Sequence, residues 1–549
     1  MILNPPSKHP FVTRGMLNVL WVLLPLSCHA GFSWIGFSPT DEGWLQAVAR
    51  RMLEGEMPHR DFISVRPVLS AMLQMPVVGL GGEHTFWWAR LWGWLEAGAI
   101  AWLWSGLLTP GGSPSWTRHL AFASAFFLAV HNFPIMAWHT LDGLLLCSLA
   151  VVLAHRNTGA GWCAAFLCVG LAILCRQNFA FFLPFLLLGL PWRQWWRAAW
   201  VAAPGIAYLA WMTAGGALED LFHQILATRG ALAKAALAQY LESSLFFSGL
   251  IGGAVLGRVL AIVRNRSVAI ASAAGLLGAI TLTGSWLMAS SGDGAIRFSF
   301  LLFGAGLALL LSVPAGQIER VLRLKLVAAI GLAWVASISL GYSSPALMGG
   351  VLLLSVGRLL MCAANAPEPV GQGGRLLLLP LAVVLSLAQA HARQNYPYME
   401  RPARDLQWDA GAVLSGASSL RTNALTYAVL EDLQNLVAEQ EAAGRPYALL
   451  SDFSAHWVRA RQRNPLPLEW PQQTELTTDP ALQTRFFQSM RNLPPGSVII
   501  AQKYLAMAHP AGFVPIQRAQ WFYPAQAWLA AHGTPIRETP FFHLYAAPR

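Results

Sequence analysis

Residues 245–289 read LFFSGLIGGAVLGRVLAIVRNRSVAIASAAGLLGAITLTGSWLMA. Two apolar runs, at 245–263 and 268–289, flank a short polar link that carries Arg264 and Arg266. Each run has about the 20 residues that a helix needs to cross a bilayer core. Because lipid offers no hydrogen-bond partners to the backbone, a segment that crosses it must pair its own N–H and C=O groups. The stretch therefore predicts two membrane helices joined by a basic loop.

Apolar runs of this kind recur along the first 390 or so residues. Of the 549 residues, 55% are hydrophobic and only 11% are charged, whereas a soluble protein carries about 25% charged residues. The N-terminal run resembles a signal peptide, but its apolar stretch continues to Phe37, so we expect an uncleaved helix. The sequence predicts an all-α polytopic bundle over residues 1–392, with thirteen membrane helices at about 16–37, 86–108, 118–134, 138–154, 161–176, 178–191, 198–214, 245–263, 268–289, 298–314, 325–341, 345–362 and 375–391.

The net charge of +11 is concentrated in short loops. Basic residues fall on alternate connections, and the positive-inside rule places those connections and the N-terminus in the cytoplasm. The first loop (38–85), residues 215–244, the loop around Asp293 and the C-terminus are then extracytoplasmic. This topology accounts for the charge, so no nucleic-acid partner is expected. The basic groups used are Arg118, His155, Arg156, Arg193, Arg197, Arg264, Arg266, Arg320, Arg323 and Lys325.

All six cysteines lie in apolar runs, and neither a disulfide framework nor metal-ligand spacing is visible. No Gly-rich phosphate loop or metal-binding DxD motif is apparent either. We therefore predict no metal and no cofactor.

The first loop departs from the charge rule, since it is predicted outside yet is rich in arginine. Residues 42–54 alternate as an amphipathic helix that lies in the membrane interface, with Thr40 or Asp41 as its cap. Residues 67–80 are apolar but too short to span, which indicates a second interfacial or re-entrant segment. Charged residues that break the topology rule, as those of the first loop do, indicate a functional site.

After residue 392 the composition becomes that of a soluble domain, with nearly balanced charge. Residues 420–443 and 521–532 are typical of helices, the second closed by Gly533. Residues 447–451, 497–501 and 541–546 are typical of short buried strands. We predict a small extracytoplasmic α/β domain over residues 393–549.

The run Asp41-Glu42-Gly-Trp-Leu-Gln-Ala-Val-Ala-Arg-Arg, continuing through Asp61-Phe to Val65-Arg66-Pro67, resembles a known loop. It is similar to the first extracytoplasmic loop of the GT-C glycosyltransferases, in the protein O-mannosyltransferase and lipid A aminoarabinose transferase branch (families 39 and 83). Later elements follow in the family's order over residues 38–190: Ala89-Arg90-Leu91, Thr140-Leu141-Asp142, and Gly170 to Arg176 before Leu183-Pro184.

The chain departs from that pattern in two places. Arg66 and Arg176 stand where the aminoarabinose branch typically has Lys, which keeps the positive charge and adds a planar, two-pronged donor for phosphate. The Pro-Pro of the loop is Pro67-Val68 here, so we expect a different turn.

The resemblance implies an inverting transfer of a monosaccharide from a polyprenyl-phosphate carrier to a lipid, protein or glycan acceptor, in a bacterial inner membrane. Such a reaction needs a base for the acceptor and positive charge at the departing phosphate. Asp41 is the candidate base, with Glu42 and Asp61 as alternatives. Arg66 and Arg176 are the candidates for binding the donor phosphate.

Asp142, His139 and Arg297 are candidates for positioning donor or acceptor. Each has a plainer interpretation: an ion pair with an arginine for Asp142, an interfacial imidazole for His139, and a membrane anchor for Arg297. Asp41 and Glu42 could likewise be a helix cap plus a solvated charge. The rival functions are a transporter or flippase of a lipid-linked sugar and a non-catalytic cell-envelope assembly protein.

Overall fold

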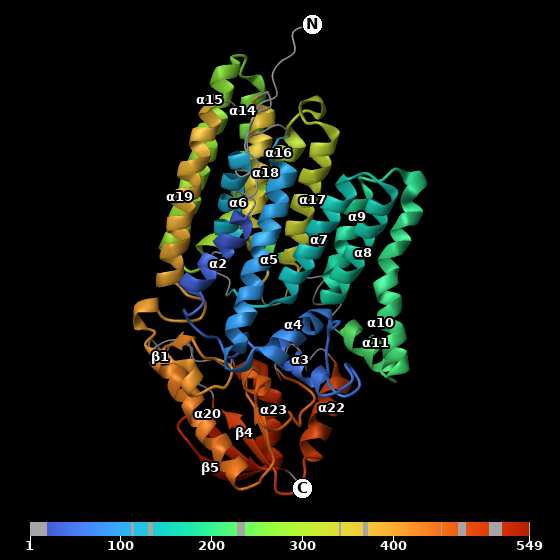
Figure 1. Cartoon of the computed structure of the whole chain (residues 1–549), viewed down its shortest axis with the longest axis vertical. Coiled ribbons are helices and arrows are strands. Elements are labelled where there is room, and N and C mark those ends of the chain that lie inside the picture. The colour runs from blue at the N-terminus through green and yellow to red at the C-terminus, as the bar shows by residue number, and fades with distance from the viewer. Residues whose placement is uncertain are drawn as a thin grey trace.

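The computed structural model describes residues 19–110, 115–129, 135–227, 237–339, 342–365, 372–451, 453–469, 471, 479–503 and 519–547. Long helices form one end of the molecule and a region of short strands and helices forms the other (Figure 1). Two short helices, α3 (Trp44–Leu53) and α4 (Leu69–Leu80), lie between these ends.

Each predicted membrane run overlaps a helix. Within the described residues, four segments are long and apolar enough to cross a membrane by length and composition: Ser244–Ile262, Arg266–Ser290, Gly294–Ser312 and Ala346–Ala363. The count of thirteen spans therefore stays a prediction. The bundle comprises α2 (Leu20–Phe32), α5 (Thr85–Leu108), α6 (Ser115–Ala129), α7 (His139–His155), α8 (Gly159–Cys175), α9 (Leu183–Leu187), α10 (Ala202–Ala214), α14 (Ser244–Ile262), α15 (Arg266–Ser290), α16 (Gly294–Ser312), α17 (Arg320–Ser337), α18 (Gly349–Ala363) and α19 (Gln372–Asn395).

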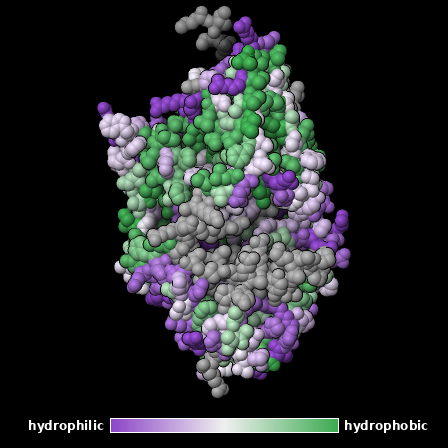
Figure 2. Space-filling model, turned by 180° about the vertical axis from the view of Figure 1, so that it is seen from behind, coloured by the Kyte–Doolittle hydropathy of each residue, from purple (hydrophilic) through white to green (hydrophobic). Residues whose placement is uncertain are grey.

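Small residues let neighbouring bundle helices approach closely. α14 packs along α16, and a Cβ added to Gly304 would lie only 2.2 Å from the carbonyl oxygen of Phe246. Such close backbone contact is typical of helices in lipid, where van der Waals packing replaces the hydrophobic drive to associate. Apolar side chains gather on the outer surface of the bundle (Figure 2).

Helix α3 begins later than predicted, and its start differs in kind. Its N-cap residue is Gly43, whose φ of 101° lies in the left-handed region, and no side chain caps the helix. The predicted cap by Thr40 or Asp41 is therefore wrong. A Cβ on Gly43 would lie 2.5 Å from the Cα of Ala455, so this turn is pressed against the C-terminal region.

The C-terminal region contains the predicted elements and several that were not predicted. Helices α20 (Ala424–Ala442) and α23 (Ala519–His532) and strands β3 (Tyr447–Leu450), β4 (Val498–Gln502) and β6 (Phe542–Ala546) match expectation. Strand β5 (Thr534–Glu538) and helix α22 (Pro480–Arg491) are additional. The sheet order is β3-β4-β6-β5, with β3 parallel to β4 and the other pairs antiparallel. Strands β1 (Trp408–Asp409) and β2 (Arg421–Thr422) form a separate antiparallel pair.

The first loop and the C-terminal region share one hydrophobic core. Trp44 and Phe62 of the loop belong to the same buried cluster as Tyr447 and Trp457, which lie about 400 residues later in the chain. Burial of apolar surface is the main favourable term in folding. The first loop and the C-terminal region therefore stabilise each other.

Candidate active site

Asp41 lies in the turn before α3, where its side chain is half-buried. The hydroxyl of Tyr398 donates a hydrogen bond of 2.8 Å to Oδ2 of Asp41. Burial raises the pKa of Asp41 to about 6, the Tyr398 bond lowers it, and the charge of Glu42 raises it further. Tyr398 follows the last bundle helix, α19, and nothing in the local sequence marks it as a partner of Asp41.

Glu42 is fully engaged in an ion pair. Its Oε2 accepts from Nε of Arg90 at 2.8 Å and its Oε1 accepts from Nη2 at 2.5 Å. Arg90, on α5, also donates to the backbone carbonyl oxygens of Ser33 and Gly36. Removing one partner of a buried pair costs about 3–5 kcal/mol. Glu42 therefore fastens the turn that carries Asp41 to the bundle.

Asp61 lies elsewhere on the loop, beside an open cleft of about 590 Å³. It pairs with Arg60 at 2.8 Å and accepts from the backbone N–H of Met57 at 2.7 Å. The hydrogen bond from Arg60 lowers the pKa of Asp61. Within the described part of the chain, no hydrogen bond joins it to Asp41. The low pKa makes Asp61 a weaker base than Asp41.

Arg66 and His139 lie beside Trp44, and Arg176 lies near both of them. The Cζ of Arg66 lies 5.1 Å from the centroid of the Trp44 ring. Arg176, buried just beyond α8, donates to Oγ1 of Thr140 at 2.9 Å. The positive charges of Arg66 and Arg176 repel each other, and both act on the ring of His139. Arg66, Arg176 and His139 are called the arginine cluster below.

His139 is buried, and its interpretation as an interfacial imidazole stays a prediction. It opens α7, and its ring centroid lies 5.8 Å from that of Trp44 and 4.6 Å from that of Trp138. Its Nδ1 is buried without a hydrogen-bond partner. A neutral imidazole can donate or accept at this nitrogen, which gives the arginine cluster a further polar group.

Asp142 and Arg297 make no hydrogen bond or ion pair with the arginine cluster among the described residues. Asp142, on the first turn of α7, is buried, and its carboxyl interacts with that of Glu96 on α5. An ion pair between Asp142 and an arginine does not occur among the described residues. Arg297 is exposed on the first turn of α16. No hydrogen bond or ion pair in the described ranges links its side chain to Asp41 or the arginine cluster.

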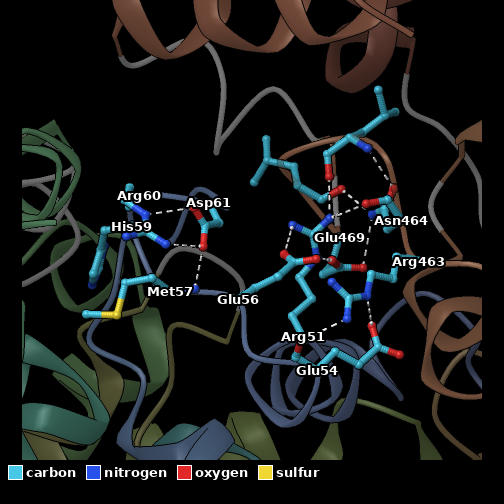
Figure 3. A network of polar contacts seen from close by, with 12 residues as sticks. Arg51, Glu54, Glu56, Met57, His59, Arg60, Asp61, Arg463, Asn464 and Glu469 are labelled. Carbon is cyan, nitrogen blue, oxygen red and sulfur yellow. Dashed lines mark hydrogen bonds and ion pairs between the residues drawn. The ribbon is translucent and has the colours of Figure 1, made fainter. Parts of the chain in front are cut away.

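The polar face of α3 is covered by the C-terminal region, a contact that the sequence did not predict. Figure 3 shows Arg51 of α3 between Glu56 and Glu469. The Arg51–Glu56 distance is 3.2 Å, and Nη2 of Arg51 also donates to the backbone oxygen of Asn464 at 2.8 Å. Nearby, Arg463 reaches Glu54 at 3.3 Å. These contacts fix the loop against residues 463–469.

No three His, Cys, Asp or Glu side chains come together as a possible metal site in the described segments. The arrangement around α3 instead supplies a carboxylate with a raised pKa and a positively charged cluster. A carboxylate of this kind can accept a proton near neutral pH, and arginines can bind a phosphate.

No family model matches the chain, and no curated protein matches it. Crystal structures of ArnT from Cupriavidus metallidurans align with most of the chain. The apo form aligns over 97% of this chain and 98% of ArnT, with 11% sequence identity and a TM-score of 0.41. The form bound to undecaprenyl phosphate aligns over 96% and 98%, with 11% identity and a TM-score of 0.37. ArnT is a GT-C lipid A aminoarabinose transferase, from the branch that the first-loop motifs resemble.

Proposed function

We propose that this chain is an integral membrane glycosyltransferase that moves a monosaccharide from a polyprenyl-phosphate carrier to a lipid, protein or glycan acceptor. The observation that carries the proposal is the closeness of a base and a phosphate-binding cluster. Asp41 precedes Trp44, the ring beside which Arg66 and His139 lie, by three residues. Three residues span at most about 11 Å, so one small substrate can reach both.

The chemistry follows from these groups. Asp41 takes the proton from the acceptor hydroxyl, whose oxygen then attacks the anomeric carbon. The bond from that carbon to the phosphate oxygen breaks, and its electron pair leaves with the phosphate. Arg66 and Arg176 stabilise the negative charge that develops there. A single displacement inverts the anomeric carbon.

A pKa of about 6 suits this role, because a general base works best with a pKa near the working pH. A transporter would place its charged groups near the middle of the bilayer. Here Asp41 and Arg66 lie where the first loop meets the bundle, and this placement favours chemistry over transport.

The domain organisation follows from the same proposal. Residues 1–392 form the membrane bundle, with the catalytic loop at 38–85, and residues 393–549 form an extracytoplasmic domain that covers the loop. The N-terminus lies in the cytoplasm and the enzyme resides in the bacterial inner membrane. Support comes from the basic residues on alternate connections.

The substitution Asp41→Asn tests the proposal. Asn can still accept the hydrogen bond from Tyr398 but cannot take the acceptor proton. General-base catalysis contributes about 10²–10⁴-fold, so turnover should fall by that factor while melting temperature and binding of a polyprenyl-phosphate sugar stay close to wild type.

Asp405→Asn, at an exposed carboxylate outside the loop, is the matched control. Product is measured with purified protein and polyprenyl-phosphate sugars extracted from membranes. Unchanged turnover in Asp41→Asn would remove Asp41 as the base and move the search to Asp61.

A further inference from the structure

A tryptophan- and arginine-rich segment lies at the end of the bundle opposite the candidate active site. α7 and α8 run between the two ends: His139 and Arg176 lie at the site, whereas His155 and Gly159 lie at the far end. The 3-10 helix η3 (Trp192–Val201) packs along α8, and the side chain of Arg197 covers Gly159.

None of the ten residues of η3 is buried. Trp192, Trp195 and Trp196 are 73%, 51% and 65% exposed. Each tryptophan offers about 150–250 Å² of surface that is normally buried. Three such side chains together form an apolar patch of the kind that marks an interaction site.

The patch is also basic. The Cζ of Arg193 lies 5.5 Å from the ring centroid of Trp192, and the Cζ of Arg197 lies 5.5 Å from that of Trp196. The sequence contains no Asp or Glu between Asp142 and Glu219. The arginines of this segment therefore have no carboxylate partner from neighbouring sequence, and their charge complements an anion.

The chain continues from η3 into α10, which presents an apolar surface. Ile206 is 64% exposed, and Leu209 and Trp211 are exposed further along the helix. An apolar flank that ends in tryptophans and arginines matches the layers of a bilayer, with acyl chains beside α10 and headgroups beside η3. Trp prefers the headgroup level, and the planar guanidinium of Arg can grip a phosphate with two hydrogen bonds.

We propose that η3 binds an anionic phospholipid, whose headgroup phosphate lies on Arg193 and Arg197 and whose acyl chains lie along α10. The site is separate from the arginine cluster and does not depend on the proposed sugar transfer. It anchors the η3–α10 side of the bundle to negatively charged lipid.

Affinity for defined lipids tests the site. Full-length protein in neutral detergent is titrated with dioleoylphosphatidylglycerol or dioleoylphosphatidylcholine, and bound lipid is counted by native mass spectrometry. Wild type should favour the anionic lipid. In the double variant Arg193→Ala/Arg197→Ala, affinity for it should fall about fivefold per arginine, while affinity for phosphatidylcholine stays unchanged.

The matched control is Arg264→Ala/Arg320→Ala, which removes two exposed arginines from other loops predicted to lie at the same end. It should keep the wild-type preference, and Arg66 and Arg176 are intact in both variants. The proposal is overturned if wild type shows no preference, if the η3 variant keeps it, or if the control loses as much. A protein that co-purifies with wild type but not with the η3 variant, at equal lipid affinities, would assign the patch to a protein partner instead.

Discussion

Replacing Tyr398 by Phe removes the hydroxyl that donates to Asp41 and leaves the ring in place. That hydrogen bond lowers the pKa of Asp41 against the larger effect of burial, and the resulting value is about 6. A hydrogen bond to a charged group contributes about 1.5–3 kcal/mol, and one pKa unit corresponds to about 1.36 kcal/mol. Its loss should therefore raise the pKa of Asp41 by about one to two units.

The sign of the effect on activity follows from the role of a base. Asp41 must be ionised to accept a proton, so activity is present above its pKa and is lost as the pH falls through it. For wild type we expect the half-maximum at about pH 6. In Tyr398→Phe we expect it at about pH 7–8, with a plateau at higher pH close to that of wild type.

The assay is product formation by purified full-length protein from about pH 5 to about pH 9 at constant ionic strength, so that the curve spans both half-maxima. Tyr396→Phe is the matched control, because the Tyr396 hydroxyl donates to the backbone oxygen of Ser290 and not to Asp41. A Tyr398→Phe profile with the wild-type half-maximum, or one lowered equally at every pH, would refute the reasoning.

Four further substitutions test the loop and its cover. Arg66→Ala and Arg176→Ala should each lower kcat/KM for the donor about tenfold to hundredfold, with part restored by Lys; wild-type values in both would exclude them from the site. Gly43→Ala should lower the melting temperature, because it adds about 1–3 kcal/mol of backbone strain and a clash with η8 (Ser454–Val458). An unchanged melting temperature would contradict the tight turn. Arg51→Ala leaves the buried Glu469 unpaired, at a cost of about 3–5 kcal/mol, and should speed proteolysis of the C-terminal region; unaltered digestion would show that the network does not hold it.

Local patterns were enough to predict most elements of the C-terminal region. Helix α23 ends before Gly533, and β4 is a short buried apolar run. Each element can therefore be predicted from its own residues. The signal for α22 was also present, since Asp479 caps the helix and Pro480 opens it. Strand β5 has no such signal: all five residues are exposed and it contains Pro535, as an edge strand can.

The partners of the candidate site residues could not be predicted in the same way. Asp41 and the two arginines stand out by residue type and by their place in the loop. Tyr398, however, meets Asp41 across 357 residues of sequence, and Arg90 meets Glu42 across 48. Such contacts depend on tertiary packing, which leaves no periodicity or spacing to detect. For the same reason the cover over the polar face of α3 was not predicted.

The contacts that cover α3 also set an order of events during synthesis. Arg51 bonds to the backbone of Leu466, which is 415 residues further along the chain. At about 5–20 residues per second, a ribosome needs roughly 20 to 80 seconds to make the intervening chain. Until then the first loop lacks the cover of residues 463–469, although Tyr398 is made earlier. We therefore expect a nascent or prematurely terminated chain to stay silent, so that only finished molecules consume carrier-linked sugar.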